Sequence, residues 1–159
     1  MNIKMNINVL VESLAEDLSR EYSHWNFYLQ SATSIEGLHR EEIGEFLLDQ
    51  SKEEMGHVEE FKRLLHGLIK RRNLNYKVST KIADFKNNLS DCVEILNEAL
   101  KIEDEVVSNY VVRIQQACEL QENGGEDAID GKYIELFLED QILDSRKDAD
   151  HIRMMLSKI

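Results

Sequence analysis

The sequence predicts an all-α protein, a four-helix bundle made of two antiparallel helix hairpins joined by a long crossover. Two observations carry this prediction. The 159 residues contain no proline and only 7 glycines, so little interrupts long helices. Apolar residues also recur at steps of three and four along four segments, the period of a helix with one buried face. The length suits a single domain over residues 1–159.

Four segments carry the helical period. The first covers residues 8–35 and the second residues 41–72. The third is the most regular, because its inward positions alternate steps of four and three without a miss over residues 89–117. The fourth covers residues 132–157. Each segment is long enough to form one side of a bundle.

The connections set the predicted topology. A short turn at Gly37 makes the first two helices an antiparallel hairpin. Residues 73–86 are long enough to run back along the bundle, which allows the third helix to lie parallel to the second. Residues 122–131 (ENGGEDAIDG) are predicted to form a polar loop that joins the last two helices as a second hairpin.

Composition narrows the range of partners. The formal charge of −12 argues against nucleic-acid binding, which needs a basic face. No stretch approaches the roughly 20 apolar residues that span a bilayer, and the N-terminus lacks the apolar run of a signal peptide. We therefore expect a cytoplasmic protein with no membrane partner. Cys92 and Cys118 are expected on one helix, about 39 Å apart and unable to bridge each other.

Polar residues fall on apolar faces in a pattern that repeats in the two halves of the chain. The second and fourth segments each carry a carboxylate three residues before a histidine. The first and third segments each carry a glutamate seven residues before a tyrosine. The four pairs are Glu54 and His57, Asp148 and His151, Glu21 and Tyr28, and Glu103 and Tyr110.

This pattern points to a metal site. Burying an ionised carboxylate is costly unless it is paired or bound to a metal. Arg113 lies one step off the third seam and Arg146 off the face of His151, so neither is expected as an internal partner. Two carboxylate–histidine pairs with a glutamate from each other helix can hold two divalent ions. We predict six catalytic, metal-ligating residues: Glu21, Glu54, His57, Glu103, Asp148 and His151. Oxygen and imidazole ligands suit iron, with manganese as an alternative.

Other residues near these positions have two interpretations. Tyr28 and Tyr110 are either core aromatics or hydrogen-bond donors to metal-binding carboxylates. Gln50 and Asp144, one turn before each carboxylate–histidine pair, are candidate neighbours of the ligands. Three other histidines lack this context. His39 and His66 are expected at the surface, and His24 is expected to pack or to face solvent.

The motifs resemble the ferritin-like superfamily, particularly bacterioferritins and Dps-like ferritins with a site at the bundle centre. The resemblance covers most of the chain. It implies that Fe(II) is oxidised by oxygen or peroxide and that the protein forms a hollow homo-oligomeric shell. It also implies Glu21, Glu54, His57 and Glu103 as ligands, with Glu54 and Asp148 or Glu103 as bridges between two irons.

The sequence departs from the family pattern in ways that shape these expectations. Asp148 stands where family members usually have glutamate, and its shorter side chain favours a labile second iron. Eight residues follow His151, too few for the fifth helix of bacterioferritin-type subunits, so a shell of twelve subunits is expected over one of twenty-four. Met55 falls at the haem-ligating position of bacterioferritins, although packing is the favoured role for this methionine.

Three functions fit these observations. The leading hypothesis is a di-iron ferroxidase that sequesters iron in a shell. The second is a rubrerythrin-like peroxidase, which is disfavoured because the sequence has no CxxC iron motif. The third is a metal-free helical interaction protein whose polar core is a relic, an interpretation that Asp148 keeps open.

Overall fold

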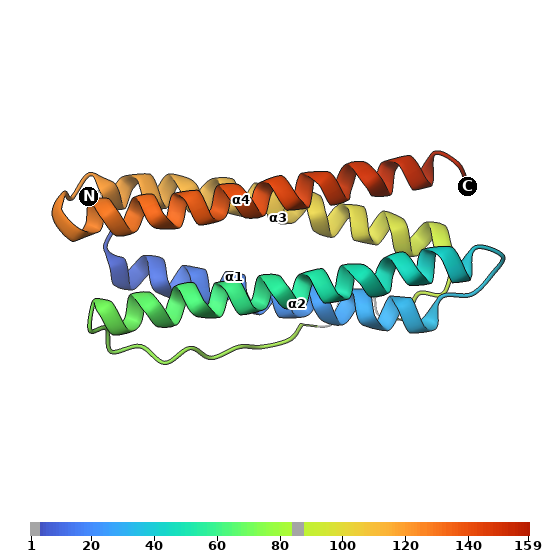
Figure 1. Cartoon of the computed structure of the whole chain (residues 1–159), viewed down its shortest axis with the longest axis horizontal. Coiled ribbons are helices and arrows are strands. Elements are labelled where there is room, and N and C mark those ends of the chain that lie inside the picture. The colour runs from blue at the N-terminus through green and yellow to red at the C-terminus, as the bar shows by residue number, and fades with distance from the viewer. Residues whose placement is uncertain (1–3, 84–87) are drawn as a thin grey trace.

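The computed structural model describes residues 4–83 and 88–159, which form four long helices (Figure 1). These are α1 (Ile7–Ser34), α2 (Arg40–Arg71), α3 (Cys92–Gln121) and α4 (Gly125–Leu156). The predicted four-helix bundle of two antiparallel hairpins with a long crossover is confirmed. Helices α2 and α3 begin at the same end of the molecule and run in the same direction, as the length of the crossover predicts (Figure 1).

Local sequence sets where the helices begin and end. The side chains of Asn6 and Asp91 each accept a hydrogen bond of 3.0 Å from a backbone N–H in the first turn, of α1 and α3 respectively. After α1 the chain turns at Gly37, where φ is 105°, and after α2 it turns at Asn73, where φ is 52°. Glycine and asparagine are the residues that adopt such left-handed conformations most readily.

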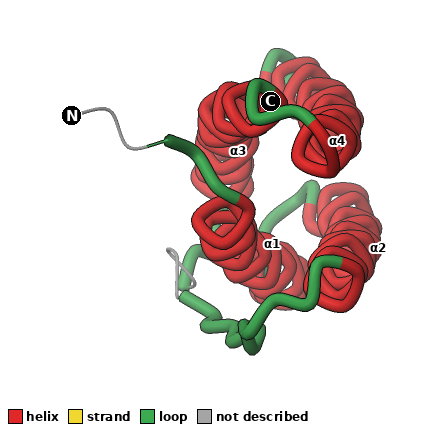
Figure 2. The backbone as a smooth tube through the Cα atoms, turned by 90° about the vertical axis from the view of Figure 1, so that its left-hand side faces the viewer, coloured by secondary structure: helices red, strands yellow, loops and turns green. Residues whose placement is uncertain are grey.

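The hairpins pack as two pairs of helices. In the end-on view, α1 lies beside α2 and α3 lies beside α4, and the main backbone approach between the pairs is that of α1 to α3 (Figure 2). Each helix turns one apolar face toward the others. Within the described residues, no helix combines the length and the apolar character that crossing a membrane requires.

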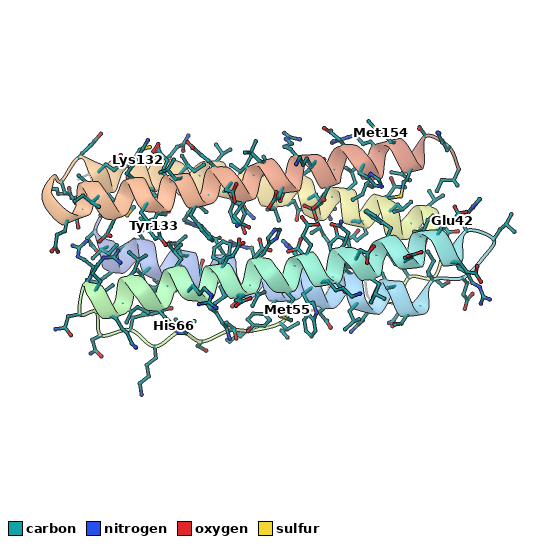
Figure 3. All side chains as sticks on the ribbon, in the orientation of Figure 1. Glu42, Met55, His66, Lys132, Tyr133 and Met154 are labelled. Carbon is teal, nitrogen blue, oxygen red and sulfur yellow. The ribbon has the colours of Figure 1, made fainter. Side chains whose placement is uncertain are left out.

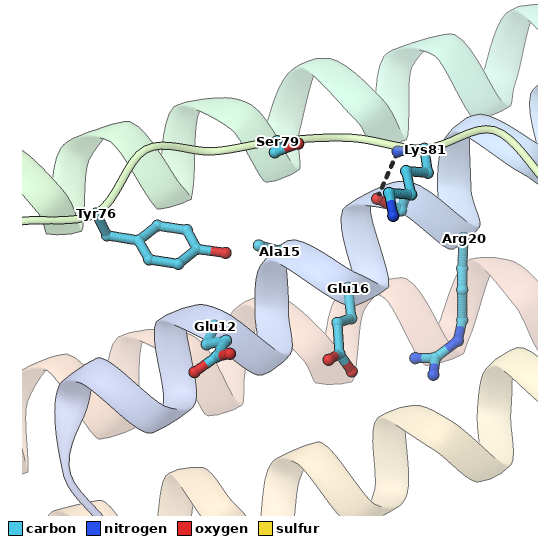
Figure 4. Close-up of a pocket in the computed structure, with 8 residues that line it drawn as sticks. Glu12, Ala15, Glu16, Arg20, Tyr76, Ser79 and Lys81 are labelled. Atoms are coloured by element: carbon cyan, nitrogen blue, oxygen red, sulfur yellow. Dashed lines mark hydrogen bonds between the residues drawn. The ribbon is translucent and has the colours of Figure 1, made fainter.

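The crossover lies along the outside of the first hairpin (Figure 2). The backbone N–H of Lys81 donates to Ser19 Oγ at 3.1 Å (Figure 4). That of Ala83 donates to Ser23 Oγ at 2.8 Å. Residues 84–87 of the predicted crossover lie outside the described residues, and α3 begins at Cys92 rather than at residue 89. Serines on the outer side of α1 thus hold the returning chain against that helix.

The predicted loop over residues 122–131 is wrong, because α4 already begins at Gly125. Acidic residues in the first turn favour a helix N-terminus. Two of the early acidic residues also hold the end of α2, since Arg72 donates to Asp127 at 2.6 Å and to Asp130 at 2.8 Å. Gly131 serves helix packing, because a Cβ atom there would lie 2.7 Å from the carbonyl oxygen of Ala117.

Buried apolar side chains form two separate clusters along the bundle. One includes Leu14 and Phe61, and the other includes Phe27 and Leu47. Along each helix, buried polar residues come between the residues of one cluster and those of the other. Glu21 on α1 and Glu103 on α3 are examples. The middle of the bundle is therefore a polar layer between two apolar halves.

Candidate metal centre

The polar layer contains five of the six predicted metal ligands. Glu21 from α1, Glu54 and His57 from α2, Glu103 from α3 and Asp148 from α4 are all buried. They reach one layer because the steps of three and four residues place them on the inward faces of their helices. His151, the sixth, is exposed.

Three ligands of the first half form what we call the inner cluster: Glu21, Glu54 and His57. Each offers an atom that lies within 4.8 Å of the other two. His57 Nδ1 is 3.3 Å from Glu54 Oε2 and 3.7 Å from Glu21 Oε2. Two carboxylates and an imidazole nitrogen thus converge from two helices on one point.

The two tyrosines link the halves of the chain reciprocally. The Tyr28 hydroxyl on α1 donates to Glu103 Oε1 on α3 at 2.7 Å. The Tyr110 hydroxyl on α3 donates to Glu21 Oε1 on α1. Of the two interpretations of these tyrosines, the structure therefore selects hydrogen bonding to a predicted ligand, and each tyrosine serves the glutamate of the other half.

The second half is arranged differently. Asp148 is buried, and its Oδ2 atom has no hydrogen-bond partner among the described residues. The His151 ring instead stacks on Phe46, with ring centroids 5.1 Å apart. It lines, together with Asp148 and Gln50, a pocket of about 520 Å³ between α2 and α4. The structure thus brings Asp148 to the polar layer and leaves His151 at the mouth of this pocket.

A second group of potential ligands lies on the other side of the His57 ring, and we call it the outer cluster: Glu53, His57 and Asp144. His57 Nε2 is 3.4 Å from Asp144 Oδ2 and 4.0 Å from Glu53 Oε1. The repeat position of Asp144 predicts that it lies near the metal ligands, and it does. Sequence reasoning missed Glu53, although its spacing of four residues from His57 could have revealed it.

Burial and mutual proximity shift the pKa values of the inner cluster. Burial raises the pKa of Glu54 well above its usual range, and the charge of Glu21 raises it further. Burial alone would lower the pKa of His57, but the neighbouring carboxyl groups of Glu21 and Glu54 raise it to about 12. Burial works against ionisation of Glu21, yet the neighbouring Glu54 carboxyl and His57 imidazole lower its pKa. Without a metal, Glu54 therefore holds a proton while Glu21 and His57 are oppositely charged.

The carboxyl groups of the second half also retain protons near neutral pH. Burial raises the pKa of Glu103 to about 8, and the charge of Asp148 contributes to the rise. Burial raises the pKa of Asp148 to about 7, and the charge of Glu53 contributes. Deprotonation of these groups is therefore part of any metal binding at this layer.

Cationic side chains do not neutralise the predicted carboxylate ligands. Among residues 4–83 and 88–159, no lysine or arginine forms an ion pair with Glu21, Glu54, Glu103 or Asp148. Arg113 pairs with none of these four carboxylates, as expected, but it does have a different buried partner. Arg113 is buried, and its Nε donates at 2.7 Å to Asp17, one turn from Glu21. Its long side chain reaches inward from a position beside the seam.

Of the two expectations for His24, packing or facing solvent, the structure shows packing. This histidine is buried, and its Nδ1 atom lies 3.9 Å from Glu21 Oε2. Burial lowers the pKa of His24, against the pull of the Glu21 charge. A neutral imidazole therefore lies next to the inner cluster, one turn along α1 from the glutamate.

The donor set fits a divalent metal ion. Glu21 Oε2 and Asp148 Oδ2 are buried oxygens that receive no hydrogen bond within the described residues. A buried carboxylate oxygen without a donor is costly, and a metal ion would compensate its charge. Carboxylates with one imidazole are ligands suited to iron or manganese, and the inner cluster brings such atoms within 4.8 Å of one another.

Four long helices around a buried layer of carboxylate and imidazole groups define a helical-bundle protein with a candidate metal site. Residues 11–159 match the Ferritin family model, described as the ferritin-like domain. The chain belongs to this ferritin-like family, which confirms the resemblance stated from the motifs. A comparison with curated proteins gives no match.

Solved structures share the fold. A ferritin-like, diiron-carboxylate protein from Bacillus anthracis is 24% identical, with a TM-score of 0.74 over 98% of this chain and 99% of that chain. An iron-soaked variant of PmFTN is 16% identical, with a TM-score of 0.63 over 95% and 88%. A dodecameric thioferritin, the bacterioferritin-related protein from Bacteroides fragilis, is 19% identical, with a TM-score of 0.57 over 98% and 93%.

Proposed function

We propose that this protein is a di-iron ferroxidase, which oxidises Fe(II) with oxygen or hydrogen peroxide and sequesters the iron in a homo-oligomeric shell. The observation that carries the proposal is the inner cluster, where Glu21, Glu54 and His57 converge within a buried layer. No lysine or arginine of the described residues pairs with these carboxylates. Membership of the ferritin-like family and fold neighbours described as diiron-carboxylate proteins support iron as the substrate.

The two proposed iron positions are unequal. The first Fe(II) binds Glu21, Glu54 and His57, displacing the proton on Glu54 and the extra proton on His57. Glu103 and Asp148 would hold the second, and the family resemblance implies that Glu54 would be shared between the two positions. His151 would complete this second set only after its ring leaves the stacking contact with Phe46. We therefore propose a tightly held first iron and a labile second one.

The protein's contribution to the reaction is geometry and charge. Each Fe(II) gives one electron to the oxidant, so two of them with two protons reduce one hydrogen peroxide to two waters. The carboxylates compensate the increase in charge as Fe(II) becomes Fe(III). The hydroxyls of Tyr28 and Tyr110 hold Glu103 and Glu21 in orientation, because each donates a buried hydrogen bond to one carboxylate oxygen.

An Fe(II) oxidation assay tests this function. Fe(II) is added without oxygen, oxygen or peroxide follows, and the absorbance of Fe(III) is recorded for the wild type and a Glu54→Ala/His57→Ala variant. We expect oxidation well above the variant's rate, together with a molar mass of many subunits by light scattering. A wild-type rate equal to that of the variant would sink the ferroxidase assignment.

Metal analysis separates this function from a metal-free interaction protein with a relic site. The purified wild type is expected to retain iron, or manganese as the alternative, and the double variant to lose it. The rubrerythrin-like alternative predicts peroxide consumption without iron storage, in a dimer. We propose twelve subunits as the shell size, because that is the assembly of the Bacteroides fragilis fold neighbour.

Haem is a less favoured additional cofactor. Met55 is exposed on α2 (Figure 3) and lines a pocket of about 490 Å³ with Tyr22 and His66. Lys62 and Arg63 also line this pocket and could pair with carboxylates of a haem. A haem titration of the wild type and of Met55→Leu tests this role. If Met55 ligates haem, the wild type shows a change in haem absorbance and the variant does not.

A further inference from the structure

The outer side of α4 carries apolar side chains that the bundle does not bury. Ile129, Leu136 and Leu143 are 72, 53 and 65% exposed, and we call them the outer row. They follow one another at intervals of seven residues, close to two full turns, so they line up along the helix. The opposite side of α4 packs in the core through Ile134 and Leu138.

Helix α4 has apolar residues on two opposite sides, and the fold of a single chain buries only one of them. The inner side of α4 is already covered by the other helices, while the outer row is open to solvent. Regular apolar spacing along an exposed helix is typical of a surface that packs against another helix. The charges around the outer row indicate which helix that is.

Oppositely charged residues flank the row in a self-complementary order. Lys132 and Tyr133 project from different sides of α4, one on each flank (Figure 3). One helical repeat further on, Glu139 follows on the flank of Lys132, and Asp140 follows on the flank of Tyr133. Each flank therefore has a cationic or hydroxyl donor toward the N-terminal side of Leu136 and a carboxylate toward its C-terminal side.

We propose that the outer row packs antiparallel against the outer row of a second copy of this chain, with a twofold axis at Leu136. Leu136 then meets Leu136 of the partner subunit, and Ile129 meets Leu143 of the partner subunit. Such an interface is isologous, with the same surface on both copies.

The antiparallel register satisfies both flanks at once. It brings Lys132 beside Glu139 of the partner subunit and Tyr133 beside Asp140 of the partner subunit, and the twofold axis repeats both contacts. A parallel twofold pairing would instead set each flank against the opposite flank of the partner, which brings Glu139 beside Asp140 of the partner subunit. Like charges at the same level oppose pairing, so charge selects the antiparallel arrangement.

This contact goes beyond the proposed function, since it does not depend on iron. The outer row lies on the far side of α4 from Asp148 and the polar layer, so substitutions in the row leave the metal ligands in place. Fe(II) oxidation and pairing can therefore be measured separately in the same variants.

Disulfide formation across the twofold axis tests the proposal. Leu136→Cys is made in a Cys92→Ser/Cys118→Ser background, and Val112→Cys, at a 50% exposed position on α3, is the matched control. Mild oxidation of dilute protein should give at least about tenfold more covalent dimer for Leu136→Cys, because pairing raises the effective thiol concentration. Equal cross-linking of the two variants, or none in either, would overturn the proposal, and a different protein docked on the row gives that same negative result.

A charge exchange tests the register without a new cysteine. Lys132→Glu should weaken self-association by about two- to fivefold in sedimentation, the effect of an exposed ion pair. Lys132→Glu/Glu139→Lys should restore it, because the two charges exchange places across the axis. A double variant that associates no better than the single one contradicts the antiparallel pairing. Unchanged Fe(II) oxidation in these variants would show that the metal centre is intact, whatever the association result.

Discussion

The two halves of the chain carry the same motif and place it differently. In the first half, Glu54 and His57 both lie in the buried layer, and the imidazole contacts two carboxylates. In the second half, Asp148 is buried, while His151 is exposed and stacks on Phe46. A carboxylate three residues before a histidine therefore does not by itself define a metal-binding pair; the residues around it decide.

The neighbours of the motif differ between the halves at equivalent positions. Glu53 precedes Glu54, whereas Lys147 precedes Asp148, so the position four residues before the histidine is a carboxylate in the first half and a lysine in the second. Near the tyrosine–glutamate pairs, Asp17 and Arg113 form a buried ion pair at one end of the site. At the equivalent positions of the other end, the buried residues are Ala99 and Ser31. The two ends of the site therefore differ: one has a buried ion pair, and the equivalent positions at the other end have uncharged residues.

The largest effect is expected where the halves differ in buried charge. Arg113→Ser leaves Asp17 buried with Arg20 as its remaining ion-pair partner, and should lower the free energy of unfolding by about 3 kcal/mol. Asp17→Ala/Arg113→Ser installs the residues of the other half and should cost less than the single change, although it removes more side-chain volume. Urea unfolding of the metal-free variants measures both. A double variant less stable than the single one would show that packing, not charge, dominates.

Substituting the two histidines of the motif should have unequal effects on metal affinity. His57→Ala removes a ligand of the inner cluster and should weaken binding of the first Fe(II) or Mn(II) by about 10- to 100-fold, the range for perturbing a metal site. His151→Ala should change this affinity by less than about threefold, because its ring lies outside the buried layer. Anaerobic calorimetric titration compares the two. Equal losses would mean that His151 leaves Phe46 and ligates.

The stability of the metal-free protein should fall as the pH rises from about 5 to about 9. Glu103 and Asp148 have folded-state pKa values of about 8 and about 7, above their ordinary values of 4.5 and 3.8. The stabilisation from their retained protons is complete below the ordinary values and is lost as the pH rises through 7 to 8. His57 acts in the same direction, whereas the lowered pKa of Glu21 matters only in acid.

Thermal unfolding at several pH values measures this trend, with Mn(II)-loaded protein as the comparison. The bound ion replaces the protons, so loading should stabilise the protein more at pH 8.5 than at pH 6. A melting temperature that stays constant over this range without metal would contradict protonated carboxyls in the second half.

Substituting each tyrosine tests whether the two tyrosine–glutamate hydrogen bonds contribute equally to stability. Tyr28→Phe and Tyr110→Phe each remove the donor to a buried carboxylate oxygen, and each should cost about 1–2 kcal/mol of unfolding free energy. Similar losses would support the reciprocal linkage, and a variant with wild-type stability would show that its carboxylate finds another donor. Because Tyr110 serves the inner cluster, its loss should weaken first-metal binding more than that of Tyr28.

The smallest expected effect is a repair of the second half. Asp148→Glu adds one methylene and restores the glutamate that the family pattern leads one to expect. Its carboxylate should reach the shared position more fully and raise the affinity for the second metal several-fold, with the first unchanged. Titration to two metals per chain detects this change. A fall in second-metal affinity would indicate that the shorter aspartate is already matched to the site.

The four helices and most of the candidate site follow from periodicity alone. Steps of three and four put Glu21, Glu54, Glu103 and Asp148 on inward faces, and the structure buries all four. The beginning of α4 could not be found this way, because the favourable contact of Arg72 with Asp127 and Asp130 joins residues far apart in the chain. From the sequence alone, the glycines and aspartates of residues 122–131 suggest a loop. The contact with Arg72, which favours the helix there, is visible only in the structure.

Side-chain reach explains what periodicity left open at the site. Arg113 sits beside the inward seam, but its flexible side chain extends to Asp17 in the neighbouring helix. His24 lies off the main stripe of α1, and the structure nevertheless buries it beside Glu21. His151 lies at the predicted repeat position, and a stacking partner on α2 decides the direction of its ring.

The polar layer between the two apolar clusters also has a consequence for folding. Four uniformly apolar helix faces could slide past one another by a turn at little cost. Here such a slip would carry Glu21 or Glu103 into a cluster lined by leucine, phenylalanine and isoleucine, and would separate both tyrosines from their acceptors. Only one alignment of the helices keeps every buried charge among polar neighbours. The residues proposed to bind iron therefore also align the bundle before any metal arrives.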